Sequence, residues 1–199
     1  MRKDYLIIGV ALFIAFSCHH WSVNRGKFEP GVVAPNEPRQ VIDQSLKAFS
    51  FLNYTIHPVA TFEIKALVLS DRHYFWGEEA KLAPVDLALG WGPMSDGTVL
   101  KNISVSQGVR WYFFYYQKSL IDQSVIVSHS GNMHMIPANK EIEKALKQAK
   151  KGNVISFKGY LVNITKSDGW RWNSSLSRTD TGAGSCEVVW VSEFEILER

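Results

Sequence analysis

Residues 138–152, "ANKEIEKALKQAKKG", form the clearest helical pattern of the chain and decide how the rest is arranged. Asn139 is a typical N-cap residue, and Glu141 lies in the first turn, where a carboxylate is favoured. Apolar residues recur at helical spacing on one face: Ile142, Leu146 and Ala149. The lysines that follow complement the carbonyl groups of a helix end, and Gly152 is the expected C′ residue.

Strands are expected on both sides of this helix. Before it, alternation and β-propensity predict strands over residues 60–70, 103–117 and 124–130. After it, they predict strands over residues 153–164, 169–178 and 186–197. Gly108 is expected at a bulge and Gly159 at a bend, and shorter helices are expected over residues 40–49 and 95–102. This order predicts an α+β fold, mostly antiparallel, either as an OB-like partly open barrel or in another α+β arrangement.

Composition excludes some classes of protein. Of the 199 residues, 46% are hydrophobic, so the chain can bury a core and is not globally disordered. The net charge of +3 comes from scattered lysines and arginines, so we expect no nucleic-acid partner. Cys18 and Cys186 are the two cysteines; we do not expect them to pair, and no CxxC cluster indicates zinc.

The first 23 residues have the character of an export or anchoring segment. Arg2 and Lys3 precede an unbroken apolar run over residues 5–18, which is long for a signal peptide and short for a spanning helix. Three alternatives stay open: an uncleaved transmembrane anchor that contacts the membrane through residues 5–21, a cleaved signal helix, or lipidation at Cys18. Each alternative predicts that the following domain lies outside the cytoplasm.

A linker and a single domain are expected after this segment. Residues 24–39 contain three prolines and two glycines, a composition that keeps a chain extended. The globular β-rich domain is therefore predicted over residues 40–199.

The stretch "SHSGNMHMIPAN", residues 128–139, is the first candidate site. His129 and His134 could converge on zinc or copper only if the chain turns at Gly131 and Asn132, and a third ligand would be needed. The alternative is structural: Met133 and Met135 face the core, His134 faces outward, and Pro137 leads into the helix. The structural alternative is favoured, so no metal or other cofactor is expected.

Two further motifs favour structural interpretations. Asp180 begins the triplet of aspartic proteases, but those enzymes need two such aspartates and the chain has one. Cys186 is followed by Glu187, which would raise the pKa of a nucleophilic thiol, so a small buried residue is expected there. The hydrolase alternative would use His129 and His134 with Asp180 or Glu187.

The remaining candidates are aromatic or polar. Residues 111–116, "WYFFYY", alternate between two faces of a strand, and we expect both faces to be buried. Polar residues in glycine-rich or aromatic surroundings could form structural pairs or a pocket. Together with one tryptophan, these binding candidates are Trp91, Asp96, Arg110, Asn132 and Arg178, with Asp86 beside them.

Four stretches taken together resemble a known family: "GWGPMSD", "HSGNMHMIPAN", "KGYLV" and "SRTDTGAGSCE". The resemblance covers the chain from about Ala60 to its end and is to uncharacterised bacterial proteins with an N-terminal membrane segment. It implies a bacterial source and an anchor rather than a cleaved signal, and it brings no activity. We therefore expect a single-pass protein of the bacterial inner membrane with its C-terminal domain in the periplasm.

The functional expectation is a binding or assembly module whose partners are envelope proteins. No nucleophile, base and orienting group stand at a recognisable spacing. The alternatives are the metal-assisted hydrolase above and a single-strand nucleic-acid binder, which would require a cytoplasmic domain.

Overall fold

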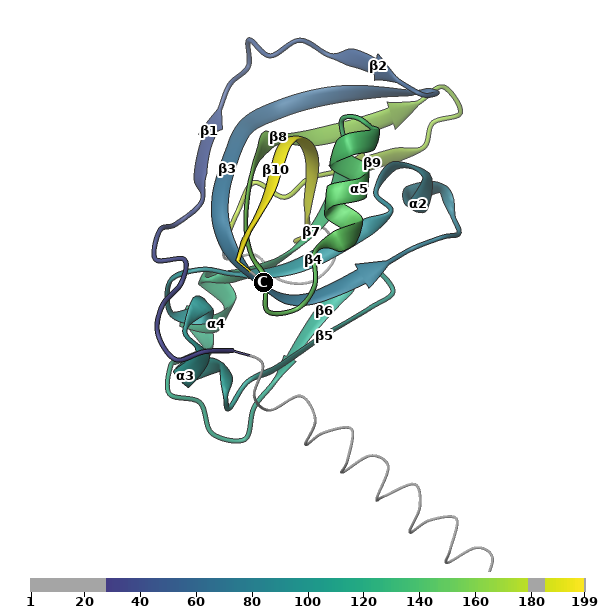
Figure 1. Ribbon diagram of the computed structural model, residues 1–199. Helices are drawn as coiled ribbons and strands as arrows, with labels where there is room; N and C mark the ends of the chain where they lie inside the picture. The colour runs from purple at the N-terminus through teal and green to yellow at the C-terminus, as the bar shows by residue number, and fades with distance from the viewer. Residues whose placement is uncertain (1–27, 179–184, 199) are drawn as a thin grey trace, which may run out of the picture.

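The computed structural model describes residues 28–178 and 185–198 (Figure 1). The helical elements are α2 (Glu78–Leu82), η1 (Gly92–Ser95), α3 (Gly97–Leu100), α4 (Gln123–Ser128) and α5 (Lys140–Gln148). The strands are β1 (Arg39–Ile42), β2 (Phe49–Phe51), β3 (Tyr54–His73), β4 (Val85–Gly90), β5 (Ser104–Gly108), β6 (Trp111–Tyr115), β7 (Ser130–Pro137), β8 (Val154–Lys166), β9 (Arg171–Asn173) and β10 (Glu187–Glu198). The predicted α+β class with mostly antiparallel strands is confirmed.

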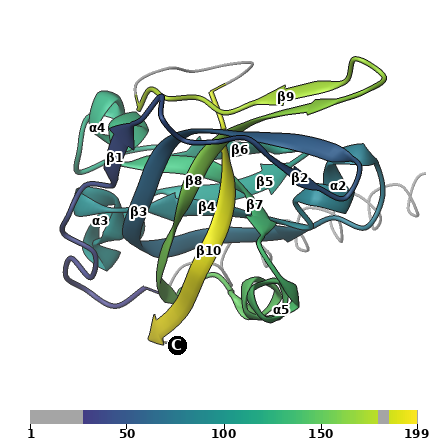
Figure 2. The same cartoon turned by 90° about the horizontal axis from the view of Figure 1, so that it is seen from above.

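The strand β3 organises the main sheet because it is long enough to pair with two neighbours. Its first part, Tyr54–Leu67, pairs with β8, and its last part, Leu67–His73, pairs with β4. The remaining pairs are β4 with β7, β7 with β10 in parallel, and β10 with β8. The hydrogen-bonded neighbours therefore follow one another from β3 through β4, β7, β10 and β8 back to β3, as the curved ribbons of Figures 1 and 2 show.

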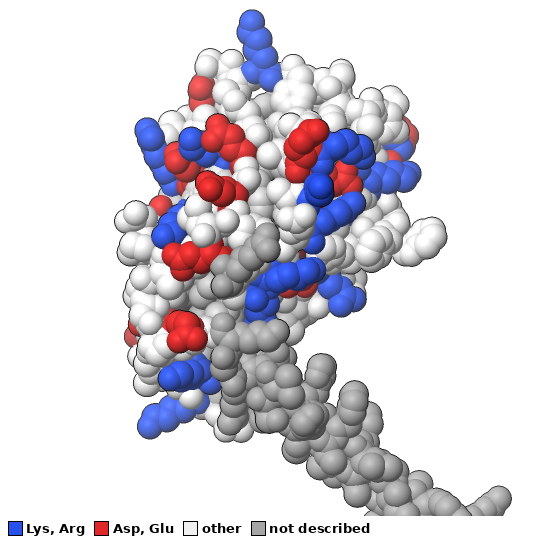
Figure 3. All heavy atoms as spheres, in the orientation of Figure 1, with Lys and Arg blue, Asp and Glu red and all other residues white. Residues whose placement is uncertain are grey.

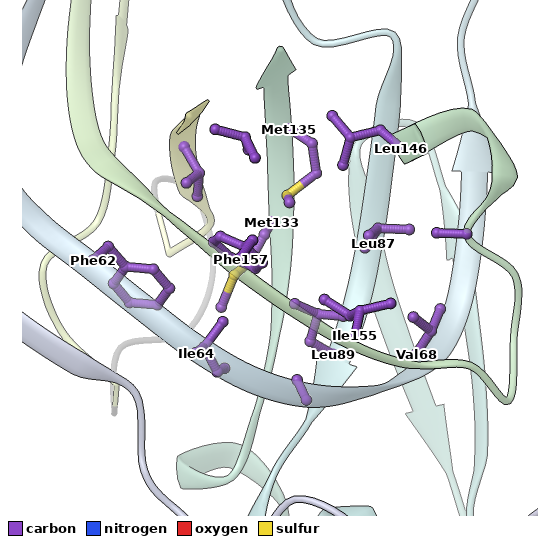
Figure 4. Packing of buried hydrophobic residues seen from close by; sticks show 14 of the residues in the cluster. Phe62, Ile64, Val68, Leu87, Leu89, Met133, Met135, Leu146, Ile155 and Phe157 are labelled. Carbon is purple, nitrogen blue, oxygen red and sulfur yellow. The ribbon is translucent and has the colours of Figure 1, made fainter. Parts of the chain in front are cut away.

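Apolar side chains fill the space that these five strands enclose (Figure 4). Phe62 and Phe157 stack with ring centroids 5.8 Å apart, and Met133 and Met135 are fully buried beside them. The expectation that both methionines face the core is confirmed. Alternation along the strands then places the intervening residues on the outer face of the sheet.

Helix α5 covers one end of this core. Asn139 is its N-cap, as predicted, and its Oδ1 accepts a hydrogen bond from the amide of Ile142 at 2.9 Å. Leu146 and Ala149 are fully buried against the strands. The helix ends at Gln148, so Gly152 is not its C′ residue; it adopts φ 94° in the following turn and donates its amide to the β3 backbone.

Several predicted elements differ from the structure. Residues 40–49 contribute to β1 and β2 rather than to a helix. The spacing of apolar residues over so short a stretch fits the period of a strand as well as that of a helix. Residues 123–128 form α4 rather than a strand, since packing of Ile126 overrides the β-propensity of a valine-rich segment. The helix expected over residues 95–102 is the shorter α3, and Asp96 is its N-cap.

Residues 103–117 form a hairpin rather than one strand. Gly108 pairs with Trp111, so the turn consists of Val109 and Arg110, with φ 51° and 68°. Positive φ at both central residues defines a type I′ turn, which is usually made by Asn and Gly. Two larger side chains there are strained, and contacts elsewhere must stabilise the turn.

Residues 28–38, which precede β1, pack against the domain. Ala34 is fully buried and its amide donates to Ser95 Oγ at 3.1 Å. A side chain at Gly97 would overlap the carbonyl oxygen of Glu29, so this close approach requires glycine. Folded structure therefore extends over residues 28–38 as well as the expected domain.

The predicted anchor, including Cys18, lies outside the described residues. Within the ranges 28–178 and 185–198, no helix has the length and apolar character needed to cross a membrane. Figure 3 shows basic and acidic side chains interspersed over the viewed face, without a region of one sign.

Candidate functional site

A buried polar layer lies on the outer face of β4 and β7. Asp86 and His134 are register partners on these strands, and the Nδ1 atom of His134 lies 3.0 Å from Oδ1 of Asp86. Because the neighbouring residues of both strands point into the core, these two side chains point away from it. They are nevertheless buried, since other segments cover this face.

Arg110 reaches this layer from the hairpin turn. Its Nη1 atom donates to Asp86 Oδ1 at 2.6 Å and to the carbonyl of Ala83 at 2.9 Å. The guanidinium lies 3.7 Å from the centroid of the Tyr74 ring, a cation–π contact. Trp172 covers the imidazole of His134 at 4.8 Å between ring centroids.

The backbone of Arg110 is held as well. Its amide donates to the Tyr74 hydroxyl at 3.1 Å, and its carbonyl accepts from Asn132 Nδ2 at 3.0 Å. Gln107 donates to Asn132 Oδ1 at 2.6 Å, and Cys186 Sγ lies 3.8 Å from the same Arg110 carbonyl. These contacts explain how two residues with positive φ persist in the turn.

The electrostatics of the layer follow from burial. Asp86 has no exposed surface, and the Arg110 guanidinium that donates to its Oδ1 offsets the loss of hydration. The Nδ1 atom of His134, although it lies beside the same oxygen, makes no hydrogen bond with any residue that the structure describes. The second oxygen of Asp86, Oδ2, has no hydrogen-bond partner among the described residues. Burial, and next the charge of Asp86, raise the pKa of Tyr74, which therefore stays a neutral hydroxyl. The layer suits a structural tie better than proton transfer.

A small pocket opens beside the layer, where β7 and β10 begin. Its volume is about 140 Å³, and an ion pair between Arg178 Nη1 and Glu187 Oε1, 2.8 Å long, forms part of its wall. Gly131 leaves room for that carboxylate, since a Cβ there would lie 3.3 Å from Glu187 Oε2. We call this the mouth pocket; it is lined by Trp111, Tyr112, Phe114, Val127, Ser130, Gly131, Ser177, Arg178, Ser185, Cys186 and Glu187.

The two candidate histidines are not brought together. His129 Nε2 pairs with Glu37 at 3.3 Å and its Nδ1 lies 3.0 Å from the Val125 carbonyl, whereas His134 contacts Asp86. Among the residues that the structure describes, no three His, Cys, Asp or Glu side chains are grouped as a metal site requires. Asp180 lies outside the described residues. His134 points away from the core as expected, yet it is buried rather than exposed.

The binding candidates divide into three places. Arg110 and Asn132 lie together in the polar layer, and Arg178 lies at the mouth pocket. Asp96 caps α3 and accepts the amide of Gly31 at 3.0 Å, which fixes the segment before β1. Trp91 is fully buried in the core cluster.

The sequence did not indicate the aromatic partners of the layer, Tyr74 and Trp172. Tyr74 follows the last residue of β3 and Trp172 is the central residue of β9, and no spacing links either of them to Arg110. The expected burial of both faces of residues 111–116 is wrong: Trp111 and Phe113 are 38% and 57% exposed on the outer face of the hairpin. These residues belong to a separate two-stranded sheet, β5 with β6, and its turn at Val109 and Arg110 carries no sequence signal of a hairpin.

Comparison with known proteins assigns no family. No family model, curated protein or solved structure matches this chain. The resemblance of its motifs to a bacterial membrane-protein family stays a prediction.

Proposed function

We propose that this chain is a membrane-anchored binding or assembly module built on an OB-like barrel. The circuit of five paired strands supports the barrel, as do the parallel pairing of β7 with β10 and the position of α5 between β7 and β8. An OB-fold is a five-stranded, partly open barrel that binds extended ligands on one face and in adjoining loops.

The contacts of Arg110 are the observation that favours a binding function over a catalytic one. Its guanidinium, amide and carbonyl are all engaged inside the molecule, by Asp86, Tyr74 and Asn132. The layer therefore holds the hairpin rigidly on the barrel, and a rigid, aromatic-rich element suits recognition. The hydrolase alternative with zinc or copper needs His129 and His134 in one place, and no observation favours it.

The mouth pocket supplies a recognition point of definite size. Tyr112 and Phe114 line this pocket of about 140 Å³ together with Cys186 and the ion pair of Arg178 with Glu187. A cavity of roughly 150 Å³ accommodates one benzene ring. The pocket therefore suits a single large side chain of a protein partner, as the central pocket of an interface does.

The location of the module is inferred from its first residues. Arg2 and Lys3 favour a cytoplasmic N-terminus, and residues 5–21 would lie in the bacterial inner membrane. The folded domain would then stand in the periplasm, where envelope proteins are its partners.

Photo-crosslinking from the pocket wall tests this function. A crosslinking amino acid replaces Val127 in the full chain carrying Cys18→Ser, so that Cys186 is the remaining thiol. We expect a discrete adduct with an envelope protein that disappears when Cys186 is first capped with a benzyl thiosulfonate. The matched control adds Cys186→Ser, and its adduct should survive the same reagent. An adduct insensitive to capping would refute recognition at the mouth pocket.

A further inference from the structure

The outer face of the β5–β6 hairpin is an exposed apolar surface. Val109, Trp111 and Phe113 are 86%, 38% and 57% exposed, while the alternate residues of β6 pack inward. Phe75 and Trp76, 77% and 91% exposed, follow directly after Tyr74, which contacts Arg110 in the turn. We call these five residues, three on the hairpin and two that follow the Tyr74 contact with its turn, the hairpin face. Large apolar side chains gathered at a surface mark an interaction site.

Positive charge adjoins the hairpin face. Residues 97–121 contain three cationic residues, Lys101, Arg110 and Lys118, and no carboxylate. Arg110 points inward to Asp86, whereas Lys101 and Lys118 are exposed and make no ion pair within the described part of the chain. Both lysines line a groove of about 320 Å³ that also contacts Tyr115, the next outward residue of β6.

The described chain begins beside this surface. Phe28 lines the same groove and packs in the cluster that contains the inner face of β6. In Figure 1, the start of the described chain and the β5–β6 hairpin lie on the same side of the molecule, opposite β2. Phe28 is seven residue steps from residue 21, where the proposed anchor ends, a span of at most about 25 Å. An anchor over residues 5–21 would therefore hold the bilayer surface close to the hairpin face.

We propose that the hairpin face and the groove of Lys101 and Lys118 dock on the anionic surface of the bilayer that holds the anchor. Indole and phenyl rings are favoured at the membrane interface, and lysines beside them are attracted to anionic headgroups. The proposal rests on the anchor of the proposed function and adds the orientation of the domain. Trp111 also lines the mouth pocket, so docking brings that pocket to the membrane surface.

Quenching of tryptophan fluorescence by brominated lipids tests the docking. The full chain is reconstituted in vesicles of phosphatidylcholine with phosphatidylglycerol, and the contribution of each tryptophan is found by difference from its Phe variant. We expect Trp76→Phe/Trp111→Phe to remove a quenched component, since both indoles contact the interface. Trp21→Phe reports the anchor separately, because Trp21 belongs to the proposed membrane segment.

Charge variants test the role of the groove. Each lysine near an anionic surface strengthens binding about fivefold. The double variant Lys101→Gln/Lys118→Gln should therefore lower the equilibrium constant for docking roughly 30-fold. Lys47→Gln/Lys65→Gln removes two exposed lysines elsewhere on the domain and should leave the quenching unchanged. Replacing the anionic lipid by phosphatidylcholine, or adding 1 M salt, should weaken docking of the wild-type chain in the same way.

The outcomes separate docking from anchoring. Quenched Trp21 with unquenched Trp76 and Trp111 would overturn the docking proposal and leave the anchor intact. Unquenched Trp21 with quenched Trp76 and Trp111 would overturn the anchor and support docking. Quenching that is equal in neutral and anionic vesicles would overturn the role of the two lysines.

Discussion

Replacement of Arg110 by methionine is expected to loosen the hairpin and destabilise the whole domain. The Arg110 guanidinium is the cation paired with Asp86 at 2.6 Å, and Asp86 has no exposed surface. Removing one partner of a buried ion pair leaves an uncompensated charge and costs about 3–5 kcal/mol. Methionine keeps the unbranched stem, so the change tests the charge and its hydrogen bonds rather than the packing.

Thermal unfolding of the full chain in non-ionic detergent, followed by near-UV circular dichroism, measures this effect. For a chain of this size, 1 kcal/mol shifts Tm by about 2–4 °C, so Arg110→Met should lower Tm by about 6–20 °C. Adding Asp86→Asn should recover part of the loss, because the orphaned carboxylate is then gone. Lys118→Met, an exposed change, should alter stability by less than about 0.5 kcal/mol.

Two results would refute this reasoning. A shift of about 2 °C or less for Arg110→Met would mean that the buried pair does not hold the hairpin. A double variant no more stable than Arg110→Met would mean that the loss does not come from the stranded charge of Asp86.

Three further predictions concern pH, backbone packing and helix capping. Hydrogen bonds from Lys166 first, and then from Lys81 and Tyr54, lower the pKa of Glu78 to about 2 from its ordinary value of 4.5. The ionised Glu78 carboxylate should therefore stabilise the fold fully above pH 4.5 and lose this effect as the pH falls towards 2. The free energy of unfolding, measured by chemical denaturation across this window, should decline less steeply with falling pH for Glu78→Gln than for the wild type. The added methyl group of Gly159→Ala would overlap a β10 carbonyl oxygen, so this change should lower the free energy of unfolding by about 1–3 kcal/mol. The control Gly108→Ala meets no atom within 4 Å and should stay within about 1 kcal/mol of the wild type. Equal shifts in Tm for the two variants would contradict this prediction. Asn139→Ala removes the α5 cap and should cost about 1 kcal/mol in the same thermal assay, and an unchanged Tm would show that the cap contributes nothing.

The elements that could be predicted from the sequence are those in which local signals agree with packing. For α5, a capping residue, a polar first turn and one apolar face all indicate the same helix. For β8 and β10, long runs of β-branched and aromatic residues indicate strands in any environment. Met133 and Met135 could be placed in the core because they alternate with polar residues.

The elements that were missed depend on contacts between distant segments. The turn at Val109 and Arg110 lacks the residues that usually mark a type I′ turn, because its stability comes from Asp86, Tyr74 and Asn132. The helix α4 contains two valines and an isoleucine, whose β-propensity is overridden by tertiary packing.

The site could be predicted only as a set of residues without an arrangement. The sequence singled out Arg110, Asn132 and Arg178, but pairing of Asp86 with His134 follows from the register of β4 and β7. Register depends on the whole sheet rather than on any motif in these strands. His129 lies apart from His134 because it is the C-cap residue of α4 and precedes β7, which carries His134.

Membrane topology is the most direct test of the proposed module. Alkaline phosphatase, which is active only outside the cytoplasm, is fused after the exposed end of β10 in the full chain, and a green fluorescent protein fusion that matures in the cytoplasm is its matched control. The account predicts phosphatase activity in a membrane fraction that resists carbonate extraction, with a dark fluorescent fusion. A fluorescent green fluorescent protein fusion, or a phosphatase fusion that is inactive or is released by carbonate, would contradict an anchored periplasmic module.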